Sequence, residues 1–255
     1  MSLFEVVCIL LAGVAAGTIN TVVGAGSLVT FPTLLLFGYP PVVANMTNAV
    51  GLVAGGASGV HGYRRELAGE APTLRRLVPA TLVGALAGAL LLLVLPAEVF
   101  EVVVPLLIGL GVVLVLLGPR FKARAARRRA AGATPRTHRV ALPLLVGLTG
   151  VYGGYFGAAQ GVLLVGILGA MLPAPLQTVN GIKNVLGLVA NATSALVFVV
   201  VVGSDIAWWT ALVLGTGALL GGVLGARIGR RLPPPLLRAV IATIGVVAIV
   251  RMLFG

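Results

Sequence analysis

The chain has very few charged residues: Asp, Glu, Lys and Arg together make up 9% of its 255 residues. An average soluble domain carries about 25%. Apolar residues account for 59%, and a further 36 residues are glycine. A water-soluble fold of this length would lack the polar side chains needed to cover such a core, and a disordered chain would contain far fewer apolar residues. The composition therefore indicates an integral membrane protein.

Cysteine and aromatic residues are also scarce. The single cysteine, Cys8, excludes an intrachain disulfide and a thiol pair for electron transfer. No Cys or His cluster has the spacing of metal ligands, so neither a metal nor another cofactor is expected. Aromatic residues make up 5% of the chain, too few to alternate with basic residues on a nucleic-acid-binding surface. Nucleic acid is therefore not an expected partner, although the net charge is +12.

The basic residues are concentrated in three short stretches. Of the 18 Lys and Arg residues, 16 lie within 64–76, 120–139 and 227–238, which is typical of the cytoplasmic loops of a multi-pass protein. We expect both termini on the opposite side of a cell (inner or plasma) membrane. Six apolar segments are long enough to span a bilayer: 41–62, 73–95, 98–118, 176–202, 206–229 and 235–254.

Two further apolar regions, 3–37 and 140–172, are too long for one crossing. Both are interrupted by glycine and small polar residues: the first contains GTIN and GAGS, and the second contains GVYGG and GAAQG. Each predicts a hairpin of two segments, or a re-entrant loop, whose backbone opens at the glycines. Open backbone is tolerated at membrane depth only where protein or a water-filled cavity satisfies it.

The two halves of the chain repeat each other. Three small residues of the first broken region, Gly17, Gly24 and Ala25, correspond to Gly150, Gly157 and Ala158 of the second. Six residues of the following span are matched too: Asn48, Gly51, Leu52, Val53, Ala54 and Ser58 pair with Asn184, Gly187, Leu188, Val189, Ala190 and Ser194. We predict an all-α membrane protein of two inverted repeats, 1–118 and 140–255, joined by a basic cytoplasmic linker at 119–139. Each repeat is a broken hairpin plus three spanning helices. This architecture is typical of secondary transporters with a site near the midplane.

All six asparagines lie in apolar segments, where an unpaired amide is costly. Asn180, Asn184 and Asn191 share one helical face with Gly187. Two interpretations are open. Amides and small residues hold membrane helices together, or the matched pair Asn48 and Asn184 contacts a substrate.

Lys183 is the one charged residue well inside an apolar segment. An ionisable residue at such depth usually faces a cavity and marks a pathway or a partner. Its counterpart would be a dissolved anion or a carbonyl-lined helix end. The alternative is a lysine near the end of its span that extends to the lipid headgroups.

The glycine-rich turns 24–27 and 157–161 could each begin a short helix. Unbonded N–H groups at a helix N-terminus, together with the helix dipole, form an anion site without a formal charge. Two such turns at matched places in the repeats predict that both face one site.

The stretch from Gly13 to Tyr63 contains GTINTVVGAGSLVTFP and NMTNAVGLVAGGASG. It resembles the start of the TauE/SafE sulfite exporter family, and the second half repeats a degenerate version, GGYFGAAQG followed by NGIKNVLGLVANATSA. The resemblance implies a multi-pass carrier for sulfite or another small sulfur-containing anion, and it alone implies the export direction. Ser27 and Gln160 stand where members of the family often have glycine, which bears on the particular substrate.

The combined expectation is a secondary transporter of a small anion, sulfite or an organosulfonate, in a lipid bilayer. An anion channel and an intramembrane enzyme are the alternatives, although the spans contain no convincing catalytic constellation. The candidate substrate-binding residues are those of the glycine turns and the polar spans: Asn20, Gly24, Gly26, Ser27, Asn45, Thr47, Asn48, Gly157, Gln160, Asn180, Lys183 and Asn184.

Overall fold

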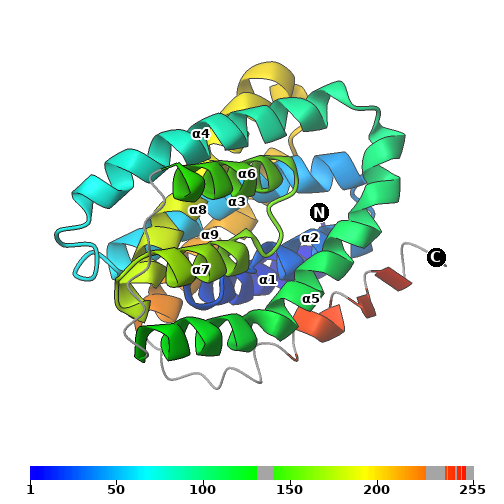
Figure 1. Ribbon diagram of the computed structural model, residues 1–255. Helices are drawn as coiled ribbons and strands as arrows, with labels where there is room; N and C mark the ends of the chain where they lie inside the picture. Colours follow the sequence, from blue (N-terminus) through cyan, green and yellow to red (C-terminus); the bar gives the residue numbers. More distant parts are fainter. Residues whose placement is uncertain (131–139, 228–238, 240, 245, 248, 251–255) are drawn as a thin grey trace.

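The computed structural model describes residues 1–130, 140–227, 239, 241–244, 246–247 and 249–250. The elements of the described chain are all helical, as expected, and run in the order α1 (Leu3–Val22), α2 (Ser27–Leu36), α3 (Pro41–Gly62), α4 (Ala71–Val94), α5 (Ala97–Ala130), α6 (Ala141–Tyr155), α7 (Gln160–Met171), α8 (Leu176–Val202), the short 3₁₀ helix Gly203–Asp205, and α9 (Trp208–Arg227). Figure 1 shows them as one bundle.

Both expected hairpins are broken at the second of their two glycine clusters. Helix continues through the first cluster, 17–20 in α1 and 150–154 in α6, so the opening expected there is wrong. The first hairpin consists of α1 and α2, separated by 23–26, and the second of α6 and α7, separated by 156–159. At 1.5 Å per residue, α2 with 10 residues and α7 with 12 are about 15 and 18 Å long. The apolar core of a bilayer is about 30 Å thick, so each of these helices crosses only about half of it.

The expected spans differ from the observed helices in two places, and a third span is largely untested. Five described helices are long and apolar enough to cross a membrane, and α3 is not among them. It has 22 residues, but Asn, Thr, Ser and Gly lower its hydropathy, and it packs against α8 and α9. The predicted span 98–118 continues as helix to Ala130, so the expected linker 119–139 begins inside α5. Most of the predicted span 235–254 lies outside the described residues.

Each broken hairpin packs closely on a long helix of the other half. In α1, Gly13 and Gly17 are spaced four residues apart, and a Cβ on Gly17 would lie 2.1 Å from the carbonyl oxygen of Ala218 in α9. In the same way, a Cβ on Gly154 of α6 would lie 2.1 Å from the carbonyl oxygen of Ala85 in α4. Small residues at this spacing let membrane helices approach until their backbones touch. The pairs α1–α9 and α4–α6 are thus built alike.

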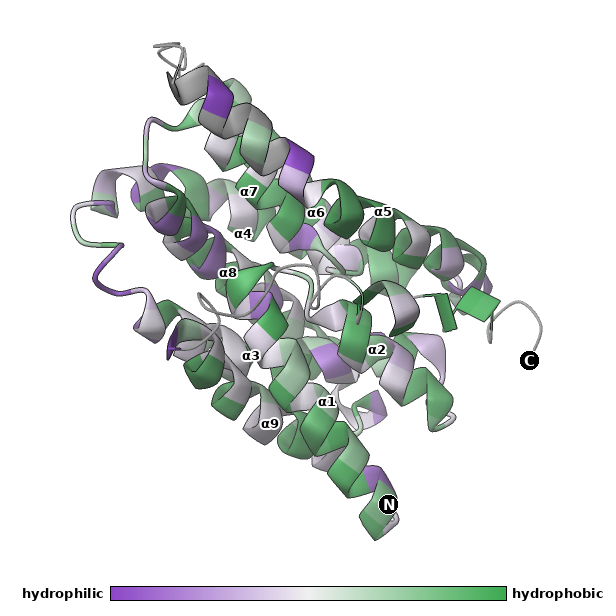
Figure 2. Cartoon of the chain, turned by 90° about the horizontal axis from the view of Figure 1, so that it is seen from below, coloured by the Kyte–Doolittle hydropathy of each residue, from purple (hydrophilic) through white to green (hydrophobic). Residues whose placement is uncertain are grey.

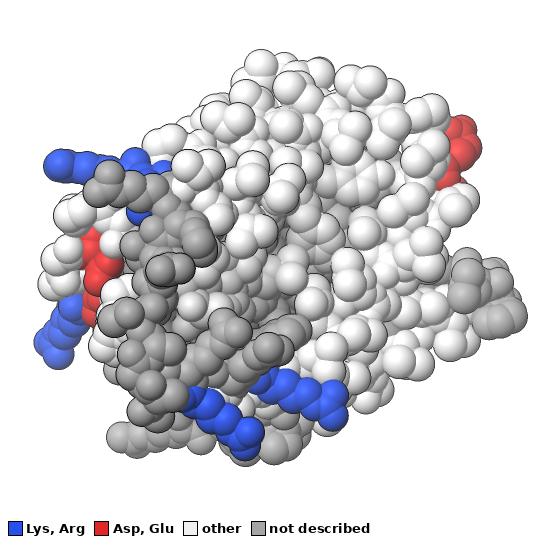
Figure 3. Space-filling model, in the orientation of Figure 1, with Lys and Arg blue, Asp and Glu red and all other residues white. Residues whose placement is uncertain are grey.

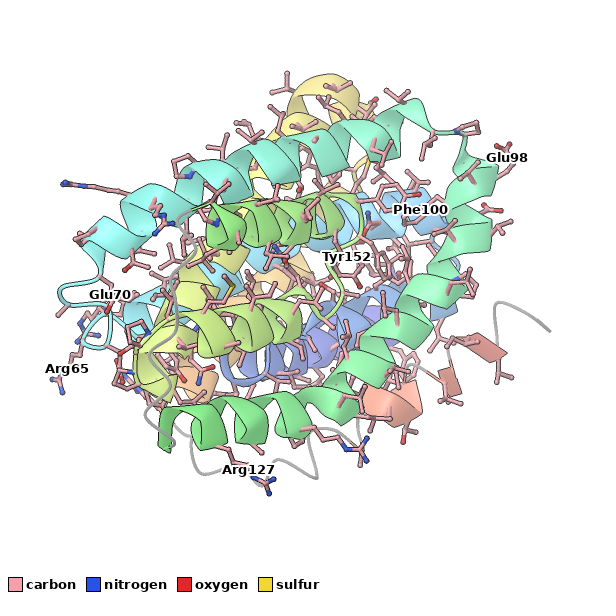
Figure 4. The ribbon with its side chains drawn as sticks, viewed as in Figure 1. Arg65, Glu70, Glu98, Phe100, Arg127 and Tyr152 are labelled. Atoms are coloured by element: carbon pink, nitrogen blue, oxygen red, sulfur yellow. The ribbon has the colours of Figure 1, made fainter. Side chains whose placement is uncertain are left out.

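The outer surface is apolar along its length and charged at its ends. Leucine and valine side chains point outward from α4, α5 and α8, and hydrophobic residues cover most of the outer helices in Figure 2. Lys and Arg lie along the left and lower edges of the molecule in Figure 3, where Figure 4 shows Arg65 and Arg127, whereas Glu98 lies at the upper right. An apolar band between polar ends matches a bilayer.

Candidate functional site

The two breaks meet at the centre of the structure. Gly24 (φ +88°) and Gly157 (φ +75°) both adopt the left-handed conformation that favours glycine. The Gly161 N–H donates to the Gly24 carbonyl oxygen at 3.0 Å, and a Cβ on Gly24 would lie 2.4 Å from the Cα of Gly161. The first residues of α7 therefore lie directly against the end of the first break.

A cavity lies beside this contact. Its lining comes from the end of α1, both breaks, the starts of α2 and α7, and the facing sides of α3 and α8: Asn20, Thr21, Gly24, Ser27, Gly56, Gly157, Gln160, Gly161, Lys183, Asn184, Gly187 and Asn191. Within this described lining, Lys183 is the one residue with a formal charge. The cavity is therefore polar and cationic, which suits a small anion.

Lys183 is held at the end of α1. Its Nζ donates to the carbonyl oxygens of Asn20 at 2.8 Å and Thr21 at 3.0 Å, and the residue is 2% exposed. Asn184 Nδ2 lies 3.4 Å from the Thr21 oxygen. The last carbonyl groups of a helix lack hydrogen-bond partners within the helix and attract cations. The carbonyl-lined end of α1, one of the two counterparts expected for Lys183, is therefore the one observed. Lys183 does not extend to the headgroups.

Gln160, the first residue of α7, lines the cavity and has a buried amide nitrogen, Nε2, that makes no hydrogen bond to the described residues. The residue is 4% exposed. Its amide group lies against the backbone of Gly153 in α6, where a Cβ would come within 2.4 Å of it. A buried amide without a partner is costly, so this donor is an attractive partner for a ligand oxygen.

The backbone N–H groups at the helix starts are less available than expected. In α7 those of Gln160, Gly161 and Val162 donate to the carbonyls of Gly157, Gly24 and Ala159. In α2 those of Leu28 and Val29 donate to Ala25 and Gly26. The expectation that the glycine turns leave these groups unbonded is therefore wrong for α7, and side chains must supply more of any anion site there.

The tight turn before α7 is fixed by its own residues. The Tyr152 hydroxyl donates to the Ala158 carbonyl oxygen, and Tyr152 points inward from α6 in Figure 4. Ala159 is the one described residue other than glycine with a positive φ, +60°. The second break is thus held in a strained conformation beside Gln160.

Seven of the twelve candidate residues line the cavity: Asn20, Gly24, Ser27, Gly157, Gln160, Lys183 and Asn184. The other five, Gly26, Asn45, Thr47, Asn48 and Asn180, are not part of its lining.

Four of these five have other contacts. Asn45 Nδ2 donates to the Tyr155 carbonyl oxygen at the end of α6, at 2.9 Å. Thr47 accepts the Ala207 N–H just before α9, and Asn48 accepts the Thr30 hydroxyl. A Cβ on Gly26 would lie 2.4 Å from the Ala16 carbonyl oxygen, so Gly26 serves close packing. These contacts connect helices, which was the alternative interpretation of the polar residues.

Asn180 has no such explanation, because its Oδ1 is buried without a hydrogen-bond partner among the described residues.

Five lining residues are absent from the candidate set: Thr21, Gly56, Gly161, Gly187 and Asn191. Gly187 and Asn191 follow Asn184 by three and seven positions on one helical face, and Gly161 ends the second glycine turn. Thr21 and Gly56 carry no sequence signal that separates them from other small residues of their helices.

The fold and this interior define a multi-pass membrane protein with a polar cavity between broken helices. The model of the family described as "Sulfite exporter TauE/SafE" matches residues 9–252. The chain therefore belongs to the TauE/SafE family and is a membrane transporter.

Its curated relatives agree with this class. "Probable membrane transporter protein YfcA" of Escherichia coli (strain K12) is 28% identical over 249 residues, covering 94% of this chain and 86% of the relative. "Probable membrane transporter protein" of Haemophilus influenzae is 26% identical over 251 residues, covering 95% and 92%. "Probable membrane transporter protein ORF9" of Sinorhizobium sp is 25% identical over 245 residues, covering 95% and 90%. No solved structure matches.

Proposed function

We propose that the protein is a secondary transporter that exports a small sulfur oxyanion, sulfite or an organosulfonate, through the central cavity. The family description supports the substrate class and the direction. The cavity chemistry supports an anion, because Lys183 is the one residue of the described lining with a formal charge and the amide side chains of Asn20, Gln160 and Asn184 lie around it.

The observation that best supports this proposal is that Nε2 of Gln160 has no hydrogen-bond partner among the described residues. This nitrogen is a buried donor on a residue that lines the cavity together with Lys183, and the oxygens of a sulfur oxyanion accept hydrogen bonds. A bound oxygen would end the desolvation cost of this amide. A neutral donor also holds an anion without adding a second buried charge, which the apolar surroundings would penalise.

We further propose that the repeats 1–118 and 140–255 are inverted and expose the site to the two sides in turn. The paired packing of α1 on α9 and of α6 on α4 supports this, as do the two breaks at matched positions. Rocking of one repeat against the other would then open the same cavity alternately.

Orientation is part of the same proposal: both termini lie outside the cytoplasm, and the basic linker 119–139 lies inside it. The gathering of Lys and Arg along the left and lower edges of the molecule in Figure 3 supports it. In a Cys8→Ser background, single cysteines at Ser204 and Thr134 are treated with an impermeant maleimide on intact cells. We expect labelling at 204 and not at 134, a position outside the described residues. The reverse pattern would overturn the topology and the inversion with it.

Flux into proteoliposomes tests the function. Saturable uptake of sulfite or an organosulfonate identifies a carrier, very high linear flux identifies a channel, and a chemically altered product identifies an enzyme. Chloride and acetate serve as comparison anions. A protein that moves none of the sulfur anions would contradict the proposed substrate class.

Two substitutions of Gln160 test the role proposed for its Nε2. Gln160→Glu replaces the donor with an acceptor and, when ionised, a repelling charge, and Gln160→Met keeps the length without polarity. We expect both to raise the apparent Km at least about tenfold, equivalent to about 1.4 kcal/mol. Gln177→Glu is the matched control, because Gln177 is exposed near the start of α8. Normal transport by both Gln160 variants would refute the role of this amide.

A further inference from the structure

The two halves place matched glycines in opposite surroundings. Gly51 of α3 and Gly187 of α8 correspond in the internal repeat. A Cβ on Gly51 would lie 2.5 Å from Cδ2 of Leu214 in α9, so this glycine allows two helices to pack. A Cβ on Gly187 would meet nothing within 4 Å among the described residues.

Neither packing nor backbone geometry explains the glycine at 187. It lies in the interior of α8, where glycine weakens a helix relative to alanine, and its φ is not in the left-handed range. Its remaining distinction is that it lines the cavity. A Cβ at this position would enter the open space.

The open space beside Gly187 is next to the polar groups of the cavity. Asn184, Gly187 and Asn191 share one face of α8 and all line the cavity with Gln160, whose Nε2 is unpartnered. From Lys183 to Asn191 the lining follows about 12 Å of helix axis. This is longer than one three-oxygen anion, so the lining residues of α8 continue beyond the group that Lys183 and Gln160 would hold.

We infer that Gly187 is a specificity-determining residue, whose missing side chain admits the organic substituent of a sulfonate. The inference rests on the proposed function and narrows it: the oxyanion end lies by Lys183 and Gln160, and the carbon substituent lies over Gly187 between the two asparagines. Sulfite, which has no such substituent, does not need this space.

Binding of sulfite and ethanesulfonate to purified protein tests this assignment. We expect Gly187→Ala to weaken ethanesulfonate binding about tenfold or more, the usual effect of a misplaced methyl group in a pocket, and to change sulfite binding by less than about threefold. Gly203→Ala is the matched control, because a Cβ there also meets nothing within 4 Å but lies away from the cavity. Equal losses for both anions, or no loss for either, would overturn the inference.

Cysteine reactivity gives a result that does not depend on the substrate. In a Cys8→Ser background, we expect the thiol of Gly187→Cys to react with a small charged methanethiosulfonate about tenfold or more faster than that of Ala190→Cys, since buried thiols are inert. Ala190 is on the same helix and 0% exposed. An unreactive thiol at 187 overturns the inference whatever is transported. A reactive thiol in a protein that binds neither anion overturns the proposed function and the sulfonate assignment, and leaves only the open position at 187.

Discussion

The ends of α1 and α6 pose the same physical problem and solve it differently. Each helix stops inside the bundle, where its last carbonyl groups need partners. At the end of α6, the neutral amide of Asn45 donates to the Tyr155 oxygen. At the end of α1, the charged Lys183 donates to two oxygens, those of Asn20 and Thr21.

The difference between Asn45 and Lys183 helps to separate the capping of a helix from a role in substrate binding. Because a neutral amide is sufficient to cap α6, capping alone does not require a buried cation at α1. A buried charge is strongly unfavourable unless it is compensated, so its presence in only one half needs a further reason. An anion in the cavity supplies that reason, and the following substitutions test the contrast from the largest expected effect to the smallest.

Lys183 is the first test, because capping and charge can be removed separately. Lys183→Met removes both, and we expect loss of transport together with a lower melting temperature, since each carbonyl left unpaired costs about 1–3 kcal/mol. Lys183→Gln keeps an amide donor, as at Asn45, and should recover much of the stability while substrate affinity stays at least about tenfold weaker. Thermal unfolding in detergent and flux per folded protein measure the two effects. Full transport by Lys183→Gln would show that the charge is only structural.

The left-handed glycines provide the second test. A Cβ on Gly24 would lie 2.4 Å from the Gly161 backbone, whereas a Cβ on Gly157 would lie 3.0 Å from the Gly153 oxygen. Both alanine variants adopt an unfavourable φ, at about 1–2 kcal/mol, but only Gly24→Ala also separates the two breaks. We expect Gly24→Ala to fold poorly and Gly157→Ala to fold with reduced stability. Equal melting temperatures would mean that the contact between the breaks contributes little.

The matched asparagines provide the third test. Asn184 lines the cavity with only a long contact to Thr21, whereas Asn48 accepts the Thr30 hydroxyl outside the cavity. Asn184→Ala should lower transport about tenfold with little change in melting temperature. Asn48→Ala should lower stability by about 1 kcal/mol and leave transport per folded protein unchanged. The opposite assignment of the two effects would move the site into the first half.

The sequence predicted the helical class, the breaks in the two hairpins and more than half of the residues that line the cavity. These features depend on glycine clusters and on polar residues within apolar segments, which can be read from the local sequence. The sequence did not separate Asn184 from Asn48. Both lie in matched positions, and only the packing of neighbouring helices decides that one faces Thr30 and the other faces the cavity.

Two other expectations were wrong for different reasons. The basic residues of 119–139 predicted a linker that begins after 118, but the helix propensity of Ala and Arg favours the continuation of α5 to Ala130. The unbonded N–H groups expected at Gln160 and Gly161 are satisfied by carbonyls of the turn and of Gly24. The contact between Gly161 and Gly24 joins distant segments and leaves no pattern in the sequence.

The smallest effect is expected at Ala159, where residue and backbone conformation are mismatched. Ala159 has φ +60° before α7, whereas the corresponding Gly26 before α2 has φ −61°, a value that any residue adopts. Ala159→Gly relieves about 1–2 kcal/mol of strain but loses a buried methyl group and gains unfolded-state entropy. We therefore expect its unfolding free energy to stay within about 0.5 kcal/mol of the original. Ala158→Gly, one position earlier and equally buried, has no such strain to relieve and should destabilise by about 1–2 kcal/mol. Equal destabilisation by both would show that the second break is not strained, and that the two breaks differ only in the partners of their helix ends.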